Sequence, residues 1–394
     1  MDSATLIRRS CYLFVILMGI VSLLADICYE GARSIAGPFL ASLGATGAIV
    51  GIVSGAGELI GYALRYFSGL LSDRLRNYWV LTIIGYIVNV LAVPLLAFAH
   101  SWQAASALLI LERIGKAIRT PPRDVMLSYA SERIGRGLGF GIHKALDQVG
   151  ALLGPLMIAA ILFFQGSYRV GFAAMIVPAL LCILVLFIAQ WAFPRPRDLE
   201  SHTPRIHSEG WSNRFWLYII AISCFAFGFV DFPLIAFYYA ERNLVSEIWI
   251  PILYAIAMAS NGLAALFLGR WYDAKGVSIL IYVALATALM APLAFSSSFI
   301  AIVIGMILWG VGMGALDSVI KAFVAELVPA EVRGEAYGLF NMCFGIAWFL
   351  GSALMGIVYN YSILGTILIS TISILISIPF LFKISNVEKT GGTA

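Results

Sequence analysis

Charged side chains interrupt the apolar segments of this sequence, and the first segment shows this most clearly. Residues 23–40 read LLADICYEGARSIAGPFL, in which Asp26, Glu30 and Arg33 follow i, i+4, i+7 spacing. A helix would therefore present all three side chains on one face. A charge at the centre of a bilayer costs about 2.5 kcal/mol or more unless it is paired or faces water, so such groups tend to line a pathway. We predict that Asp26 binds a proton, while Glu30 and Arg33 either contact substrate or neutralise each other.

The second apolar segment repeats this arrangement with Glu58, Tyr62 and Arg65. Glu58 falls near the middle of the segment and has no base one helical turn away on that side. Because burial in an apolar environment disfavours the charged form of a carboxylate, Glu58 is a second candidate for binding and releasing a proton. A salt bridge from Glu58 to a neighbouring helix is the alternative. Tyr62 and Arg65 are candidates for lining the same cavity.

Two further segments carry the densest clusters of charge. They hold Glu112, Arg113, Lys116 and Arg119 in one segment and His143, Lys144, Asp147 and Gln148 in the next. Glu112 can pair with Lys116 because the two are four residues apart, and Lys144 can pair with Asp147 at a spacing of three. Asp147 lies near the middle of its segment, which makes it a third proton-site candidate. His143 and Lys144 are cavity candidates, although a single histidine is more often a hydrogen-bonded structural residue.

The second half of the chain has fewer intramembrane charges and more aromatic residues. Asp231 lies in the middle of its segment, and Pro233 should break the helix there. Asp317 and Lys321 are one turn apart and could neutralise each other. Asp231, Asp317 and Trp309 are candidates for lining a cavity. This division predicts proton handling in the first half and an apolar substrate wall in the second, although each aromatic residue taken singly is more often a packing residue.

These residues need helices that cross a membrane, and the composition supplies them. The chain has 394 residues, of which 61% are hydrophobic and 12% charged, whereas soluble domains carry about 25% charged residues. Apolar runs of roughly 20 residues, the length that spans a bilayer as a helix, recur along the whole chain. We therefore predict an all-α integral membrane protein with twelve transmembrane helices. Their expected ranges are 11–41, 45–72, 78–99, 102–121, 136–165, 168–192, 213–240, 246–270, 277–296, 298–325, 333–360 and 362–383.

Charge in the connections sets the expected orientation. Lys and Arg gather in alternate connections, which the positive-inside rule places in the cytoplasm together with both termini. The longest polar stretch predicts a cytoplasmic linker at 193–212 between two six-helix halves, 1–192 and 213–394. GLLSDRLRNY at 69–78 matches LGRWYDAKGV at 268–277, half a chain later, which indicates duplication. The five cysteines are scattered through apolar segments and predict packing residues rather than disulfides or a metal site.

Several motifs make the sequence resemble a transporter of the major facilitator superfamily. A Gly-x-Leu-x-Asp-Arg pattern with a following basic residue comes after the second span, and a degenerate copy lies in the corresponding place of the second half. The two copies comprise Gly69, Leu71, Asp73, Arg74 and Arg76, and then Gly269, Arg270, Asp273, Lys275 and Gly276. The fifth span carries Gly150-x-x-x-Gly154-Pro155, which is similar to a motif of the family's exporters. LERIGKAIRTPPRD at 111–124 resembles a bacterial branch of efflux permeases.

The resemblance implies two pseudo-symmetric halves that alternate access to a central cavity lined by the first, fourth, seventh and tenth helices. It implies that Arg113, on the fourth helix, takes part in proton coupling. It also implies a cytoplasmic gate in which Asp73 faces the start of the eleventh helix near residues 331–334. The expected gating residues are Gly69, Asp73, Arg74, Arg76 and Asp273. Close packing of helices is expected at Gly150, Gly154 and Pro155.

We therefore expect a secondary transporter, first of all a proton-coupled antiporter that exports a small amphipathic or drug-like compound. The alternative is a proton-coupled importer or exchanger of a small organic anion, since intramembrane bases could bind a carboxylate or phosphate. These bases are Arg33, Arg65, Arg113 and Lys144. The sequence lacks Walker A, HExxH and GxSxG patterns, which argues against an ATP-driven pump or an enzyme. The expected partners are a small-molecule substrate, protons and the lipids of a bacterial cytoplasmic membrane, with no cofactor, metal or nucleic acid and a monomeric protein.

Overall fold

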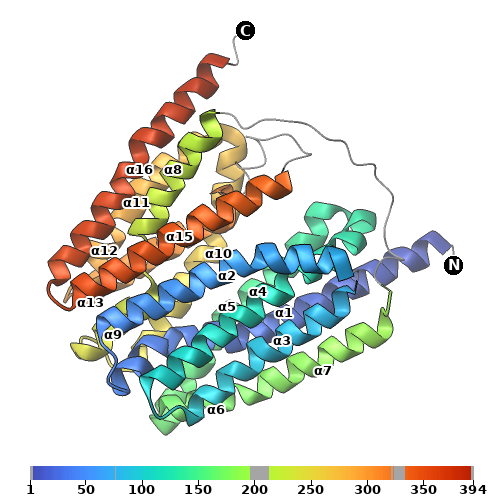
Figure 1. The fold of residues 1–394 in the computed structure, drawn as a ribbon, viewed down its shortest axis with the longest axis horizontal. Coiled ribbons are helices and arrows are strands. Elements are labelled where there is room, and N and C mark those ends of the chain that lie inside the picture. The colour runs from blue at the N-terminus through green and yellow to red at the C-terminus, as the bar shows by residue number, and fades with distance from the viewer. Residues whose placement is uncertain (1–2, 76, 196–212, 321–322, 324–332, 392–394) are drawn as a thin grey trace. The chain divides into compact units, whose positions relative to one another are not determined.

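A computed structural model describes residues 3–75, 77–195, 213–320, 323 and 333–391, and the described residues are almost entirely helical with no β-strand (Figure 1). The first group of helices is α1 (Ser3–Ser42), α2 (Gly47–Leu75), α3 (Tyr78–Leu95), η1 (Leu96–Phe98), α4 (Trp102–Ile134), α5 (Arg136–Gln165), α6 (Tyr168–Ala174) and α7 (Ile176–Ala192). The second group is α8 (Asn213–Gly228), α9 (Phe232–Glu241), α10 (Trp249–Lys275), η3 (Gly276–Ser278), α11 (Ile279–Ala288), α12 (Met290–Ala294), α13 (Phe299–Asp317), α15 (Arg333–Tyr359) and α16 (Ile363–Gly391). The all-α membrane fold predicted from the sequence is confirmed.

Membrane-spanning character is clear for most of these helices. Eleven helical stretches among the described residues are long and apolar enough to cross a bilayer. The stretch where the fourth span was expected, α4, is not among them, because its charged residues lower its hydropathy. The predicted total of twelve therefore stays a prediction. The predicted linker at 193–212 falls mostly outside the described residues.

The chain forms two compact units. Unit 1 comprises residues 1–35 and 60–204, and unit 2 comprises residues 36–59 and 205–394. These units differ from the halves expected from the sequence in one segment, 36–59, which lies in unit 2. Helices α1 and α2 each contribute to both units, and the acid Glu58 belongs to unit 2.

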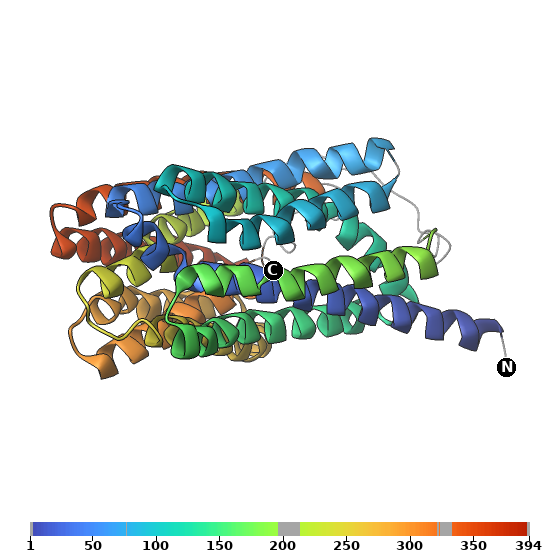
Figure 2. The same ribbon diagram turned by 90° about the horizontal axis from the view of Figure 1, so that it is seen from below.

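Unit 1 is built around close packing of α3 on α4, which lie side by side (Figure 1 and Figure 2). Two glycines permit the approach: a Cβ on Gly85 would lie 2.6 Å from the backbone nitrogen of Arg119, and one on Gly115 would lie 2.4 Å from that of Asn89. Glycine at a helix interface removes the side chain that would otherwise separate two backbones. The consequence is that the polar residues of α4 on this side are buried against α3.

Unit 2 packs α8 against α15 and α16, and α10 against α13. Segment 36–59 joins it through glycines, since a Cβ on Gly37 would lie 2.0 Å from the carbonyl oxygen of Pro233. A Cβ on Gly51 would similarly lie 2.4 Å from the carbonyl oxygen of Ser352 on α15. The core is strongly aromatic: the Phe229 ring lies 5.4 Å from that of Trp309, centroid to centroid, and 5.2 Å from that of Trp348. Trp309, predicted to line a cavity, is fully buried in this core.

Candidate functional site

Helix α5 approaches α1 through the glycine motif of the fifth span. A Cβ on Gly150 would lie 2.3 Å from the carbonyl oxygen of Leu23, and one on Gly154 would lie 2.4 Å from that of Ile27. These contacts bracket Asp26 along α1, so they fix the register between the helix that carries Asp26 and the helix that carries Asp147. Pro155 follows inside α5, which continues through it.

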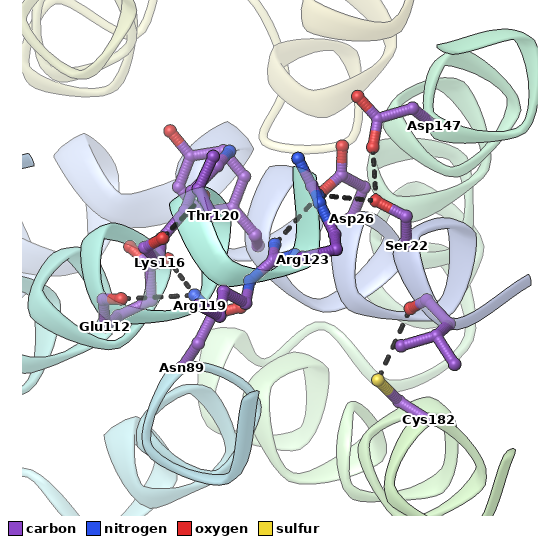
Figure 3. A network of polar contacts seen from close by, with 12 residues as sticks. Ser22, Asp26, Asn89, Glu112, Lys116, Arg119, Thr120, Arg123, Asp147 and Cys182 are labelled. Atoms are coloured by element: carbon purple, nitrogen blue, oxygen red, sulfur yellow. Dashed lines mark hydrogen bonds and ion pairs between the residues drawn. The ribbon is translucent and has the colours of Figure 1, made fainter. Parts of the chain in front are cut away.

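A short polar chain links α1, α4 and α5 (Figure 3). The Ser22 hydroxyl donates to Oδ1 of Asp147 at 2.6 Å, and Nη1 of Arg123 donates to the Ser22 oxygen at 3.3 Å. Arg123 also holds Asp124 with two donors, at 2.9 and 2.7 Å. The Lys144 ammonium lies 3.4 Å from Oδ2 of Asp147, as the spacing of three predicted. Asp147 therefore has both a hydroxyl donor and a cation beside it.

Arg119 is the most deeply buried base of unit 1, with 1% of its surface exposed. Its Nη2 lies 3.7 Å from Oδ1 of Asp26, which is itself 5% exposed. Its guanidinium carbon lies 4.2 Å from the centroid of the Tyr86 ring on α3. Burial between Gly85 and Tyr86 thus aims the arginine of α4 at the acid of α1, as Figure 3 shows for the labelled pair. Arg119 is not among the residues expected to take part in proton coupling, whereas Arg113 is.

Tyr29, one turn along α1 from Asp26, is surrounded by bases. The Lys116 ammonium lies 3.5 Å from the centroid of its ring, and the Arg113 guanidinium carbon lies 4.7 Å from it. Nη1 of Arg33 donates to the phenol oxygen at 2.9 Å. An aromatic face attracts cations and a phenol oxygen accepts hydrogen bonds, so Tyr29 gathers three positive charges of α1 and α4.

Glu112 ends this row of charges on α4, and it pairs differently from the expectation. Its carboxylate accepts a hydrogen bond from Nδ2 of Asn89 on α3 and lies 3.5 Å from Nε of Arg113. The spacing of four had suggested Lys116 as its partner. Glu112 is buried, and Gly115 lets the backbone of α3 approach α4 closely enough for Asn89 to reach this carboxylate.

Helix α4 runs straight through two prolines, Pro121 and Pro122. Pro121 has no N–H to donate to the carbonyl of Ala117, which a normal residue at that position would do. The hydroxyl of Ser68 on α2 donates to this carbonyl at 2.9 Å instead. Gly69, a predicted gating residue, lies beside Pro121, where a Cβ would make an ordinary van der Waals contact at 3.8 Å. The α2 hydroxyl thereby supports the turn of α4 that carries Arg119 and Arg123.

In unit 2, the helix break predicted at Asp231 is confirmed. Helix α8 ends at Gly228 and α9 begins at Phe232, with Pro233 in its first turn. The Asp231 carboxylate accepts hydrogen bonds from Nε1 of Trp348 at 2.9 Å and from Ser352 at 3.0 Å, both on α15. Two backbone carbonyls at the break accept hydrogen bonds from other helices. Nε1 of Trp309 on α13 donates to the carbonyl of Val230 at 2.8 Å, and the hydroxyl of Ser370 on α16 donates to that of Gly228 at 2.6 Å. Three helices therefore hold the interruption in place.

The remaining predicted residues lie on α1, α2, α5, α10 and α13 or outside the described side chains. The Arg65 guanidinium carbon lies 5.1 Å from the centroid of the Tyr62 ring on α2, and His143 is buried on α5. Asp317 is the last residue of α13, and Glu30 is buried on α1. Asp73 lies in α2 and Asp273 in α10, but the side chains of both are outside the described part of the structure. Arg74 is exposed. Arg76 and residues 331–332 are outside the described residues. The cytoplasmic gate stays a prediction.

Neither metal nor disulfide chemistry is indicated by the described residues. No group of three His, Cys, Asp or Glu side chains within the described ranges could hold a metal ion. None of the five cysteines forms a disulfide, and two of them connect helices: Cys182 of α7 donates to the carbonyl of Val21 at 3.3 Å, and Cys28 donates to that of Met175 at 3.5 Å.

Comparison with known proteins matches the chain to the Major Facilitator Superfamily over residues 18–352 and again over 232–393. An uncharacterized protein of Mycobacterium tuberculosis strain H37Rv is 39% identical over 389 residues, 97% of this chain and 95% of the relative. An uncharacterized MFS-type transporter of Methanocaldococcus jannaschii is 26% identical over 92% of each chain. The multidrug resistance protein MdtH of Cronobacter sakazakii is 22% identical over 80% of this chain and 78% of its own length. The crystal structure of the nucleoside transporter NupG shares the fold, with a TM-score of 0.72 at 14% identity, covering 95% of this chain and 99% of that one.

Proposed function

This chain belongs to the major facilitator superfamily, and we propose that within it the chain is a secondary transporter driven by a proton gradient through alternating access. The observation that carries the proton-coupling part is the contact between Asp26 and Arg119, two almost fully buried side chains of α1 and α4. An ionisable pair of this kind inside a membrane is costly to keep, and so it points to a function.

The pair has two electrostatic states. Ionised Asp26 is held by Arg119 at 3.7 Å, whereas protonated Asp26 is neutral and leaves the guanidinium without its counter-charge. Because the attraction between two charges is strong in a low dielectric, proton binding would change the preferred packing of α1 on α4. This is the kind of differential interaction that a proton needs in order to bias a conformational equilibrium.

Asp147 is the second acid that we place in the proton pathway. Ser22 lies between it and Arg123, and Asp26 is one helical turn from Ser22 on the same helix. A hydroxyl can both donate and accept a hydrogen bond, so Ser22 can relay a proton between neighbouring acceptors. We propose the order Asp147, Ser22, Asp26, with Arg119 rather than Arg113 as the coupling base. Glu58 remains a separate candidate in unit 2.

The test is flux in proteoliposomes under an imposed pH gradient, over a panel of anionic, neutral and cationic amphiphiles. We expect at least one compound to move with the gradient in the wild type and to lose the gradient response in Asp26→Asn. Asp124→Asn is the matched control, because Asp124 is half-exposed and pairs with Arg123 at the edge of the network. Gradient-independent flux of every compound, or an Asp26→Asn variant as responsive as the wild type, would refute proton coupling through Asp26.

Two kinds of cargo fit this machinery. Export of a small amphipathic or drug-like compound by antiport is supported by the likeness to proteins named for multidrug resistance. Import or exchange of a small organic anion is supported by the bases that gather around Tyr29. For either cargo we propose a bacterial cytoplasmic membrane, with both termini in the cytoplasm, since Lys and Arg gather in alternate connections.

A further inference from the structure

Lys116 is a base with no acid within ion-pair distance among the described residues. Its ammonium lies 3.5 Å from the centroid of the Tyr29 ring, and its side chain is only partly exposed. Among the described residues it makes no ion pair within 4.0 Å and no side-chain hydrogen bond. An ammonium group has three N–H donors, and an aromatic face does not replace an oxygen acceptor for them.

Arg119 adds to the same shortage of acceptors, one turn further along α4. Its Nε and Nη1 are buried and have no hydrogen-bond partner among the described residues. Its Nη2 is 3.7 Å from Asp26, which is beyond the length of an N–H···O hydrogen bond. The two bases, three residues apart, therefore offer a set of donors that one carboxylate does not satisfy.

Two other bases of unit 1, by contrast, lie beside acids. Elsewhere in unit 1, Arg123 holds Asp124 at 2.7 Å and Lys144 lies 3.4 Å from Asp147. A buried base without a partner costs free energy, and proteins keep one where a ligand supplies the missing charge. Arg33 and Arg113, which also contact Tyr29, add to the positive potential at this place.

We propose that Lys116 and Arg119 anchor the anionic group of the transported substrate, an organic oxyanion such as a carboxylate, sulfonate or phosphonate, beside Tyr29. This assignment of substrate class rests on the proposed transport function. Guanidinium and ammonium donors match an oxyanion, because charge-assisted hydrogen bonds to its oxygens satisfy donors that the protein leaves open. A phenol ring at the site also gives an aromatic or apolar body a surface to pack on.

The charges around Asp26 determine whether its protonation strengthens or weakens the binding of an anion. Lys116 and Arg119 on α4, Asp147 on α5 and Glu30 on α1 act on it electrostatically. When Asp26 is ionised it competes with the substrate for the two bases, and when it is protonated both bases are open to the substrate. The proton and the anion should therefore bind together, which is the thermodynamic signature of symport. For a cationic substrate the coupling would have the opposite sign, because protonation of Asp26 would weaken the binding of the cation.

The test uses a series of benzene derivatives whose substituent is anionic, neutral or cationic. The protein is the purified full chain in detergent micelles. Binding is measured by isothermal titration with benzoate, phenylphosphonate and benzenesulfonate as anions, and with benzamide and benzylammonium as neutral and cationic counterparts. We expect at least one anion, and neither counterpart, to bind at pH 6. In Lys116→Met the association constant should fall by about tenfold or more, the loss of one charge-assisted contact. Lys275→Met is the control, because Lys275 also lies over an aromatic ring, that of Trp271 in unit 2.

A second measurement does not depend on choosing the right ligand. If Lys116 lacks a partner in the ligand-free protein, Lys116→Met should unfold at the same temperature as the wild type or a higher one. Binding of no anion, equal binding of benzamide, or a Lys116→Met variant that unfolds several degrees lower would overturn the anion site. Anion binding that is equal at pH 6 and pH 8 would leave the site standing and contradict coupling through Asp26, so the two proposals fail separately.

Discussion

Nη2 of Arg119 lies 3.7 Å from Oδ1 of Asp26, and both side chains are almost fully buried. The separation exceeds hydrogen-bond length, so the contact is an electrostatic attraction across a narrow gap rather than a locked hydrogen bond. A locked bidentate pair would resist protonation. The longer contact fits the proposal that Asp26 exchanges Arg119 for a proton.

Removing the base of this pair should be costly. In Arg119→Met the Asp26 carboxylate loses its nearest counter-charge, and we expect the free energy of unfolding to fall by about 3 kcal/mol. Adding Asp26→Asn to that variant should recover part of the loss, because the buried charge is then gone. Thermal unfolding of the four proteins in detergent measures the coupling between the two substitutions. Strict additivity of the two changes in unfolding free energy would show that the side chains do not interact. Arg123→Met is the control: it removes the base of the more exposed pair with Asp124, so it should lower the unfolding free energy by less.

The glycine seam between α1 and α5 gives a prediction with a control on the same helix. A Cβ on Gly154 would lie 2.4 Å from the carbonyl oxygen of Ile27, so Gly154→Ala must push α1 and α5 apart. We expect a loss of about 1–3 kcal/mol in unfolding free energy. A Cβ on Gly141 would meet nothing within 4 Å, so Gly141→Ala should instead stabilise α5 by about 0.5–1 kcal/mol through its better helix propensity. Equal unfolding temperatures for the two variants would argue against the seam.

Acids singled out from the sequence lie in the polar network of unit 1, but their contacts were not foreseen. The i, i+4, i+7 spacing identified the polar face of α1, and Asp26 and Asp147 both proved to be partners in the network of unit 1. Spacing along one helix cannot say which neighbouring helix a face meets. The polar partners Ser22 and Asn89 carry no charge, so they did not stand out among apolar residues.

Arg119 was overlooked for a physical reason. The expected fourth span, 102–121, ends two residues after Arg119, which places Arg119 at the membrane boundary, where long bases commonly reach water. In the structure α4 continues to Ile134, so Arg119 lies well inside the helix. The continuation depends on Ser68, a residue of another helix, and no local rule applied to 111–124 could have included it.

That contact makes Ser68 testable. Ser68→Ala leaves the Ala117 carbonyl without its donor, and we expect a loss of about 1–3 kcal/mol in unfolding free energy. In a Pro121→Ala background the new alanine supplies an N–H to the same carbonyl, so Ser68→Ala should then cost little. Ser72→Ala is the control, since the Ser72 hydroxyl donates only within its own turn, to Gly69 at 2.9 Å. A cost for Ser68→Ala that is the same in both backgrounds would exclude this role.

Trp348 provides the corresponding prediction for unit 2. Its indole N–H donates to Oδ2 of Asp231 at 2.9 Å, and both residues are buried. Trp348→Phe keeps an aromatic ring beside Phe229 but removes a donor from a buried carboxylate, so we expect unfolding to require about 1.5–3 kcal/mol less. Trp271→Phe is the matched control: the Trp271 ring stacks on Tyr282 and is 45% exposed, so the change should stay within about 0.5 kcal/mol. The two variants are compared by thermal unfolding in the same detergent, and equal shifts would mean that the Asp231 contact contributes nothing to holding the break between α8 and α9.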